Sequence, residues 1–385
     1  MDYLNEALKL RNRLCAIRED LHRHPELGNH EIYTSSKIAQ ILTDLGLQIF
    51  HPVGPSLDTA LVAVLHGSHS GKTVALRAEL DALPIQEATI CPFSSQNPGQ
   101  MHACGHDIHM TASIGAAMLL AQNSQNLHGN IIFLFQPDEE GSGGAQRLLA
   151  SGALNDVSAV FGGHVSPDIP LGNIGIKYGK FYAASDMFKI TIHGKSCHGA
   201  TPERGVDALR AACQIVSEIT SLKPSSKDKA VVSVGKFSAG TAINVISDTA
   251  HIQGIVRTLG DTDRQEILSM IQDRVGRICS TFGASFDIQI IPSYSGIVNS
   301  FAETALLEQS ARQVLGDDKV VILTESTMTT EDFGYYISAK SGSFCHIGAG
   351  CSAPLHSSTF LPDIGAAITA SAVYAHCLAS YLSTP

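Results

Sequence analysis

Apolar positions along the first part of the chain alternate between two spacings, one typical of helices and one typical of strands. Spacing of three to four residues predicts helices at 4–22, 33–45, 107–122 and 144–152. Short apolar runs predict strands at 59–66, 73–80, 131–136 and 158–165. Because strands that alternate with helices are typical of α/β proteins, these residues predict an α/β domain with a mixed, mostly parallel sheet flanked by helices.

The pattern changes near residue 180, where the next six predicted elements follow the order strand, helix, strand, strand, helix, strand. They cover 186–194, 205–222, 230–237, 251–259, 262–282 and 285–291. This order fits a compact ferredoxin-like sandwich. Helices and short strands then resume at 301–315, 320–323, 331–339, 343–350 and 363–382.

These patterns predict two domains, as does a length of 385 residues. We expect an α/β domain formed by residues 1–180 and 291–385. A smaller ferredoxin-like α+β domain at 181–290 would interrupt it. Hydrophobic residues make up 44% of the chain, which is enough apolar material for a sizeable core.

The charge and cysteine content narrow the possible partners and compartment. The formal net charge of −10 argues against a nucleic-acid partner, because binding phosphates needs a concentrated basic surface. The chain starts with a charged amphipathic stretch instead of a secretory signal, and we expect no membrane-spanning run of about 18 apolar residues. The nine cysteines form no CxxC pair or paired framework, which is typical of reduced thiols in a cytoplasmic protein.

The first segment with chemical potential is MHACGHDIHM (101–110), in which Cys104 and His106 lie two residues apart before a predicted helix. A bend before a helix can turn two such side chains toward one point. Thiolate and imidazole are both good ligands for zinc-like metals. The plain alternative is a histidine-rich polar surface turn, and this segment alone does not decide between the two.

The second segment is FLFQPDEEGSGG (133–144), where an apolar strand runs into Asp138, Glu139 and Glu140. Sites in open α/β sheets form at the carboxyl ends of strands. Three carboxylates crowded there repel one another unless cations neutralise them. A solvated acidic loop is the alternative.

Three further segments carry candidate residues at strand ends or in loops. His164 ends an apolar strand after two glycines, and His356 lies in a loop before the last predicted helix. Glu79 and Asp81 lie at the end of another strand, where they can orient ligand histidines. Each of these residues has an ordinary structural interpretation when it is taken alone.

Taken together, four segments supply one thiolate, three imidazoles and two adjacent carboxylates. This set fits two neighbouring divalent metal ions, which can acidify a water molecule and polarise a carbonyl. One glutamate of the adjacent pair can then bind metal while the other moves protons.

At these residues the chain resembles the hippurate hydrolase and indole-acetyl-amino acid hydrolase branch of the aminoacylase and carboxypeptidase G2-like metallopeptidases, an amidohydrolase family. The matching stretches span nearly the whole chain. They are LHRHPELG (21–28), RAELDALPI (77–85), MHACGHD (101–107), FQPDEEG (135–141), GGH (162–164), SCHGATPERGVDA (196–208), NVISD (244–248), EDFGYY (331–336) and LHS (355–357).

The resemblance implies a role for each matching site residue. Two divalent ions (zinc, manganese, cobalt or nickel) would be bound by Cys104, His106, Glu140, His164 and His356. Glu139 would be the general base and then the acid that protonates the leaving amine, with Asp81 as a supporting carboxylate.

The resemblance also implies that the inserted domain is a lid and the dimerisation surface of a homodimer. His198 matches a lid histidine that polarises the scissile carbonyl, often in the partner subunit's active site. Asn244 and Arg257 match lid positions that contact substrate, and an arginine suits a carboxylate. The expected activity is hydrolysis of the amide bond of N-acyl-L-amino acids with acetyl, benzoyl or indole-acetyl groups.

Three positions depart from the family pattern, which has aspartate, alanine and proline where this chain has Glu79, Asp138 and Ser247. Asp138 adds negative charge beside the expected base and is expected to raise its pKa or alter metal preference.

Three alternatives stay open at this point. The first is a dipeptidase or carboxypeptidase of the same fold, and the second is a hydrolase with Cys104 as nucleophile. The third is a non-catalytic metal-binding scaffold.

Overall fold

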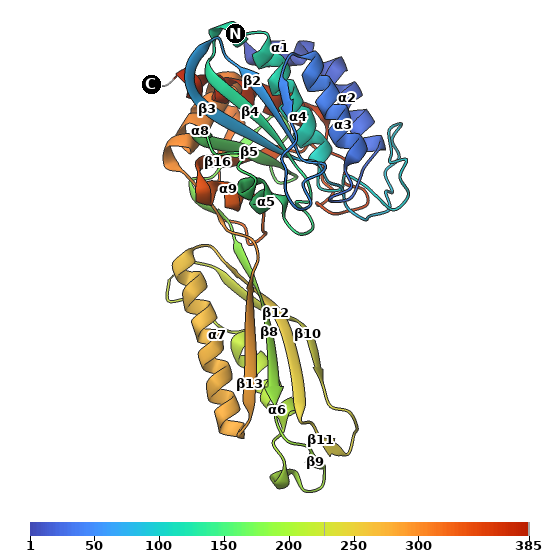
Figure 1. Cartoon of the computed structure of the whole chain (residues 1–385), viewed down its shortest axis with the longest axis vertical. Coiled ribbons are helices and arrows are strands. Elements are labelled where there is room, and N and C mark those ends of the chain that lie inside the picture. Colours follow the sequence, from blue (N-terminus) through green and yellow to red (C-terminus); the bar gives the residue numbers. More distant parts are fainter. Residues whose placement is uncertain (227, 384–385) are drawn as a thin grey trace. The chain divides into compact units, whose positions relative to one another are not determined.

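The computed structural model describes residues 1–226 and 228–383, and its internal contacts divide the chain into two compact units (Figure 1). The first unit contains Met1–Gly179, Val298–Thr324 and Tyr335–Pro385. The second contains Lys180–Ile297 and Glu325–Gly334. The chain passes between the units after Gly179, Ile297, Thr324 and Gly334. The first two of these points lie in the short strands β7 (Gly179–Tyr182) and β14 (Ile297–Asn299).

The first unit is built on an eight-stranded sheet in the order β1-β2-β4-β3-β5-β16-β6-β15. The neighbours of β3 and β5 all run parallel to them, whereas β1, β2 and β6 supply the antiparallel pairs. The strands are β1 (Gln48–Phe50), β2 (Leu61–His66), β3 (His69–Glu79), β4 (His128–Gln136), β5 (Ala159–Ser166), β6 (Ile174–Ile176), β15 (Val320–Ile322) and β16 (Ser341–Gly348). The expected mixed, mostly parallel sheet is therefore confirmed.

Helices flank this sheet, as the sequence predicts. They are α1 (Tyr3–Lys9), α2 (Arg11–Arg23), α3 (Ile32–Asp44), α4 (His106–Ala121), α5 (Gly144–Ala150), α8 (Phe301–Leu315), α9 (Gly334–Ala339) and α10 (Ile364–Ser383), with single 3₁₀ turns at Ser124–Asn126 and Asp317–Lys319. Helix α4 is buried nearly all round, because it packs between β3 and α10. Gly115 permits this close approach, since a Cβ there would lie 2.1 Å from Ser371 Oγ.

Helix α10 corrects one expectation from the sequence. By length and hydropathy it is apolar enough to cross a membrane, although the sequence analysis expected no such run. About two thirds of the apolar window, 67%, is buried inside the first unit. The apolar character of α10 is therefore explained by its place in the core, where it packs on α4 and α8.

The second unit has the ferredoxin-like order β-α-β-β-α-β. Its four strands form an antiparallel sheet in the order β10-β12-β8-β13, and both helices pack on it. The elements are β8 (Ala184–His193), α6 (Ala208–Ile219), β10 (Ala230–Ala239), β12 (Thr249–Thr258), α7 (Asp261–Phe282) and β13 (Ser285–Pro292). Alternate residues of β8, namely Phe188, Ile190 and Ile192, are buried in the core of this unit.

One segment belongs to a different unit from the one that the sequence analysis expected. Residues 325–334 were expected within 291–385 of the first domain, but their contacts place them in the second unit. The reason is backbone pairing. Thr327 N–H donates to Phe181 O at 2.8 Å, and Ala183 N–H donates to Thr329 O at 3.1 Å. Such long-range pairing leaves no periodic signal in the sequence.

A separate pair of short strands lies within the loops of this unit. It joins β9 (Cys197–His198) and β11 (Val245–Ile246), and a 3₁₀ turn at Pro202–Arg204 follows β9. Two residues per strand are too few for a period-two pattern, so neither strand could be predicted from the sequence.

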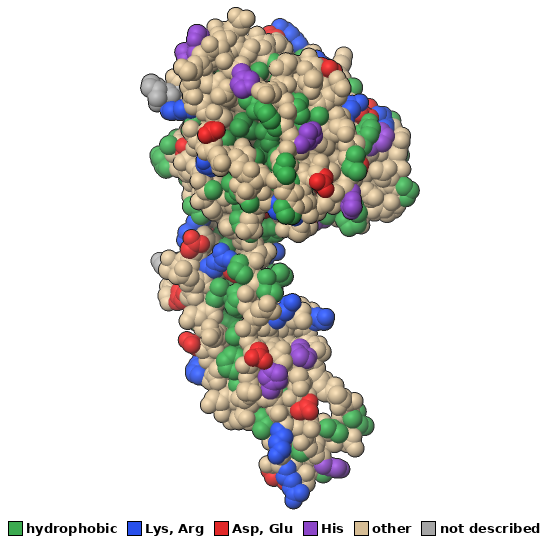
Figure 2. Space-filling view, in the orientation of Figure 1, with side chains coloured by type: hydrophobic (Ala, Val, Ile, Leu, Met, Phe, Trp, Pro, Cys, Tyr) green, Lys and Arg blue, Asp and Glu red, His purple; other side chains and the backbone are tan. Residues whose placement is uncertain are grey.

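On the face drawn in Figure 2, acidic and basic side chains are interspersed over both units.

The bidentate ion pair between Asp186 and Arg264 fixes the start of α7 to β8, and we predict that it stabilises the second unit. Arg264 Nε and Nη2 each donate to the carboxylate at 2.7 Å, and Asp186 is only 1% exposed. Replacing Arg264 with Leu should cost about 3–5 kcal/mol, because it leaves a buried charge unpaired. The free energy of unfolding of the full chain in urea measures this loss.

A matched control lies on the same helix. Arg274 pairs with Glu218 at 2.9 Å, but both side chains are about a third exposed. Arg274→Leu should therefore cost less than about 1 kcal/mol. Equal losses in the two variants would contradict the assignment of Asp186–Arg264 as the stabilising pair.

Candidate metal centre

Cys104 and His106 lie on either side of a tight turn at the start of α4. The turn needs Gly105, whose φ of +83° lies in the left-handed region. A Cβ at this position would also lie 2.5 Å from Val165 Cγ2. Both Cys104 and His106 are buried, so the glycine directs a thiol and an imidazole into the same protected space.

The thiol of Cys104 is the centre of the cluster. Its Sγ lies 3.2 Å from His164 Nε2 and 3.3 Å from His356 Nε2. His356 Nε2 also lies 3.1 Å from Glu140 Oε1. These side chains come from β5 and from three loops, one of them the turn before α4, and are separated by up to 252 residues in the sequence.

Three groups of potential ligands overlap at this point. They are Cys104 with His106 and His164, Cys104 with Glu140 and His356, and His106 with Glu139 and Glu140. Within each group the donor atoms lie within 4.8 Å of one another. The structure thus brings together all five side chains expected to bind metal. Because the groups share members, the geometry suits two neighbouring ions better than one.

The hydrogen bonds of two histidines leave one nitrogen of each ring for a ligand. His106 Nδ1–H donates to Asp81 O at 2.8 Å, and His164 Nδ1–H donates to Val165 O at 2.8 Å. In both neutral rings the lone pair is then on Nε2, the nitrogen that faces the cluster. These contacts orient the imidazoles as metal-binding histidines are oriented.

His106 Nε2 is buried without a hydrogen-bond partner among the described residues, and the only contact given for Glu140 Oε1 is the ion pair with His356 Nε2 at 3.1 Å. A buried polar atom without a partner costs about 1–3 kcal/mol. Metal coordination would satisfy both atoms. Together with the thiol and the imidazoles, they form a donor set suited to zinc-like transition metals. The residues present therefore fit the implied ions.

Charge in the cluster favours a cation. Burial opposes protonation of His106, but Asp81, Glu79 and Glu140 outweigh this effect and raise its pKa to about 10. For Glu140, burial acts in the opposite direction to His356 and His106, which lower its pKa to about 2. The acidic groups thus create a negative potential that positive charge relieves.

Asp81 supports two of the expected ligands at once. Its carbonyl oxygen accepts from His106, and its Oδ2 accepts from Glu140 N–H at 2.9 Å. Asp81 is 1% exposed and follows β3, which places it at the carboxyl end of a central strand. This position matches its expected role as a supporting carboxylate.

His356 has a backbone conformation that is uncommon outside glycine. Its φ is +63°, and its N–H donates to Ala103 O at 2.9 Å. This hydrogen bond joins the loop of His356 to the residue before Cys104. A strained backbone conformation at a potential ligand is typical of a functional site.

His109 is close to the cluster but is already hydrogen-bonded through both nitrogens. Its Nε2 accepts from Val165 N–H at 2.9 Å, so its Nδ1–H donates to Glu79 Oε2 at 2.9 Å. Glu79 in turn accepts from Arg77. His109 therefore supports the site without a nitrogen left to bind metal.

Asp138 does not act as the sequence analysis expected. We expected its carboxylate to add negative charge beside Glu139 and so to raise the pKa of Glu139 or alter metal preference. Instead, its Oδ2 accepts from Arg147 Nη2 at 3.1 Å and from Ser142 N–H at 3.2 Å. Burial raises the pKa of Asp138, but these partners outweigh burial and lower it. The charge is thus neutralised locally.

One buried carboxylate near the site was missed in the sequence. Glu31 Oε1 accepts from Asp138 N–H at 3.0 Å, and its Oε2 accepts from the Thr59 hydroxyl at 2.6 Å. Burial raises the pKa of Glu31 to about 7. Glu31 lies at the start of α3, and no local pattern connects it with the acidic segment 107 residues later.

His198, Asn244 and Arg257 belong to the second unit, whereas every expected metal ligand belongs to the first. His198 Nδ1 accepts from Ala200 N–H at 3.1 Å, which leaves the proton of the neutral ring on Nε2. Asn244 lies beside it, since Asn244 O accepts from Gly199 N–H at 2.7 Å. His198 is exposed, so its Nε2–H is a donor presented to solvent.

Arg257 is half-buried and uses one nitrogen to hold a neighbouring segment. Its Nη1 donates to Met328 O at 3.0 Å and to Thr330 Oγ1 at 3.3 Å. Nε and Nη2 have no hydrogen-bond partner that the structure gives among the described residues. They form the edge of a guanidinium that can bind a carboxylate.

Comparison with known proteins identifies the family of this chain. A model of peptidase family M20/M25/M40 matches residues 75–380. The chain belongs to this family. N-acetylcysteine deacetylase of Bacillus subtilis is 38% identical over 375 residues, 97% of each chain. Hippurate hydrolase of Campylobacter jejuni is 32% identical over 99% of this chain and 100% of its own.

A solved structure extends the similarity to the whole fold. The dinuclear metal-binding M20 peptidase YXEP of Bacillus subtilis is 36% identical to this chain and superposes with a TM-score of 0.89. The match covers 98% of this chain and 99% of the other. The protein is therefore an enzyme of the metallopeptidase and amidohydrolase type, and the predicted amidohydrolase branch is confirmed.

We predict that replacing His106 and replacing His109 have different effects on metal content. His106→Ala should lower the metal retained after dialysis, since it removes the unpartnered Nε2. His109→Ala should leave metal content near the wild-type value. It should instead destabilise the fold by about 1–3 kcal/mol, because Val165 N–H loses its acceptor. Metal analysis by mass spectrometry and thermal unfolding measure the two effects. Loss of metal in His109→Ala alone would contradict the assignment.

Proposed function

We propose that this protein hydrolyses the amide bond of N-acyl-L-amino acids with the help of two divalent metal ions. The observation that carries the proposal is the convergence of one thiol, three imidazoles and a carboxylate at the carboxyl edge of the sheet, with Glu139 next to them. Cys104, His106, Glu140, His164 and His356 would hold the ions. When bound, the ions would acidify a water molecule and polarise the scissile carbonyl.

Glu139 is the residue we assign to proton transfer. It is 8% exposed and shares a potential ligand group with His106 and Glu140. Glu139 would accept a proton from the attacking water and pass it to the departing nitrogen. A carboxylate held in this way typically contributes about 10²–10⁴-fold to the rate.

The residues of the second unit would bind and polarise the substrate. His198 Nε2–H would donate to the carbonyl oxygen as it gains negative charge. The guanidinium edge of Arg257 would bind the carboxylate of the amino acid, and Asn244 would contact the substrate. In a homodimer through this unit, His198 would serve the partner subunit's site.

A cysteine nucleophile explains the site less well. Burial of Cys104, followed by the charges of Glu140 and Glu139, raises the pKa of the thiol well above its usual range. A cysteine nucleophile needs the opposite environment, because the thiolate is the reactive form. A bound cation would stabilise this thiolate, so the surroundings favour Cys104 as a ligand.

The names of the relatives bear on the class of substrate. Named relatives include an N-acetylcysteine deacetylase and a hippurate hydrolase, and both names describe removal of an acyl group from an amino acid. Two further relatives, 35% and 34% identical, are named thermostable carboxypeptidases of Saccharolobus solfataricus, so peptides of the dipeptidase or carboxypeptidase type are the alternative substrates to test. All nine cysteines are free, which supports a cytoplasmic location.

The central test uses a panel of N-acetyl, benzoyl and indole-acetyl amino acids and dipeptides with metal-reconstituted protein. We predict turnover of acyl amino acids that is lost with EDTA and restored by zinc, manganese, cobalt or nickel. Glu139→Gln should lower kcat by roughly 10²–10⁴-fold while two ions per chain are retained. Full activity of Glu139→Gln would remove the assigned base. Absence of turnover in reconstituted wild-type protein would remove the proposed function.

Arg257→Ala should raise KM for carboxylate substrates by roughly 10–100-fold with little change in kcat, because it removes a charge-assisted hydrogen bond. The matched control is the same substrate with its carboxylate converted to a carboxamide. Its KM should be nearly equal for wild-type and variant protein. An equal loss for both substrates would show that Arg257 acts through its contacts with Met328 and Thr330 instead.

A further inference from the structure

The turn that carries Glu139 and Glu140 is held by a polar network centred on Asp138, which is itself buried. We propose that Asp138 is a positioning residue for the reaction, through a clamp formed by Asp138, Ser142, Arg147 and Asn29. We call this set the Asp138 clamp. The inference rests on the proposed role of Glu139. It assigns a role in the reaction to Asp138, a residue described so far only for its charge.

The backbone of Asp138 is the first observation. Its φ is +57°, a left-handed conformation that aspartate tolerates better than most residues with a Cβ. This conformation turns the chain sharply between the end of β4 and Glu139. Glu31 secures the turn from outside by accepting from Asp138 N–H at 3.0 Å.

The side chain of Asp138 closes the turn on its other side. Its Oδ2 accepts from Ser142 N–H at 3.2 Å and from the Ser142 hydroxyl. Arg147, on α5, donates from Nη2 to the same oxygen and to Asn29 Oδ1, both at 3.1 Å. The carboxylate thus connects the residues after Glu140 to a helix and to the loop before α3.

Two glycines make room for this carboxylate. A Cβ on Gly28 would lie 2.1 Å from Asp138 Oδ1, and a Cβ on Gly141 would lie 2.2 Å from it. Neither glycine has a left-handed φ, so an alanine at either position would strain contacts with Asp138 and not its own backbone. The absence of both side chains is explained by the space that the clamp needs.

The clamp fixes the acidic turn from one end while Asp81 fixes it from the other. Asp81 accepts from Glu140 N–H. Glu31 accepts from Asp138 N–H, and the Asp138 carboxylate accepts from Ser142 N–H. Glu139 lies between these points. Because a misplacement of about 1 Å can cost roughly 10²-fold in rate, loss of the clamp should act on kcat.

The first test compares three variants of Asp138 with reconstituted wild-type protein. Asp138→Ala should lower kcat roughly tenfold or more and change KM less than about threefold, since it removes a constraint on the base and not a substrate contact. Asp138→Asn should keep kcat within about threefold of wild type, because its amide oxygen still accepts from Ser142 N–H and asparagine tolerates this backbone. Asp138→Gly, which removes only the side chain, should resemble Asp138→Ala.

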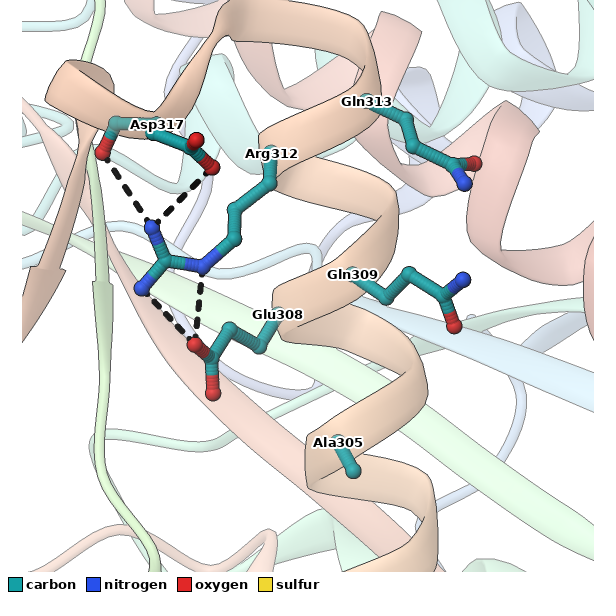
Figure 3. A pocket seen from close by; sticks show the side chains of 6 residues that line it. All are labelled: Ala305, Glu308, Gln309, Arg312, Gln313 and Asp317. Atoms are coloured by element: carbon teal, nitrogen blue, oxygen red, sulfur yellow. Dashed lines mark hydrogen bonds and ion pairs between the residues drawn. The ribbon is translucent and has the colours of Figure 1, made fainter.

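Arg147→Met tests the clamp from α5 and should also lower kcat. Its matched control is Arg312→Met. Arg312 pairs with Glu308 and Asp317 around an open pocket on α8 that no proposed site residue lines, as Figure 3 shows. Both changes remove a partly exposed arginine that donates to more than one side chain of the same unit. Only Arg147→Met should affect turnover.

Gly28→Ala gives an independent arm. It should lower kcat by displacing the Asp138 carboxylate, and the double variant with Asp138→Ala should be no worse than Asp138→Ala alone. Wild-type kcat in Asp138→Ala or Asp138→Gly, a fall in Asp138→Asn equal to that in Asp138→Ala, or additive losses in the double variant would each overturn the inference. If Asp138→Ala does not fold, Arg147→Met and Gly28→Ala decide. Inactive wild-type protein would instead count against the proposed function.

Discussion

The crowding of ionisable donors at one edge of a sheet is the constraint on which the first unit depends. A thiol, three imidazoles and several carboxylates meet there, mostly buried from water. Without positive charge such an arrangement is costly, because buried carboxylates and thiolates lose their hydration. The protein offsets part of the cost with fixed partners. The carboxylates of Glu31, Glu79, Asp81 and Asp138 accept from backbone N–H groups, an arginine, a hydroxyl or a histidine. His106 Nε2 is left without a partner among the described residues.

Rigidity around the cluster follows from the same constraint. The orientation of His106 and His164 is fixed by backbone carbonyls, and the acidic turn is held by Asp81, Glu31 and the Asp138 clamp. These contacts come from the ends of strands and the starts of helices in the core, which are the least mobile places for a site. Glycine is used where a side chain would obstruct this packing, as at Gly105 and Gly28.

The second unit differs from the first, because it contains none of the expected metal ligands. It has its own core between two helices and an antiparallel sheet, and a bidentate ion pair fixes α7 to β8. His198 and Arg257 present unused donors from loops and strand ends of this separate core. The polar groups that we propose bind substrate can therefore change without disturbing the residues proposed to bind metal, since the two sets belong to different compact units.

The sequence by itself determined the fold class, the alternation of elements, the family and the group of residues able to bind metal. It did so because apolar periodicity and the spacing of cysteine, histidine and glutamate are local properties that survive in one dimension. Only the tertiary structure decided how individual polar groups are paired. It showed that both nitrogens of His109 are occupied, that the charge of Asp138 is neutralised by Arg147, and that Glu31 holds the acidic turn. It also joined residues 325–334 to the second unit. Each of these facts depends on contacts between segments distant in the chain, and hydrogen bonds of that kind leave no periodic trace in a sequence.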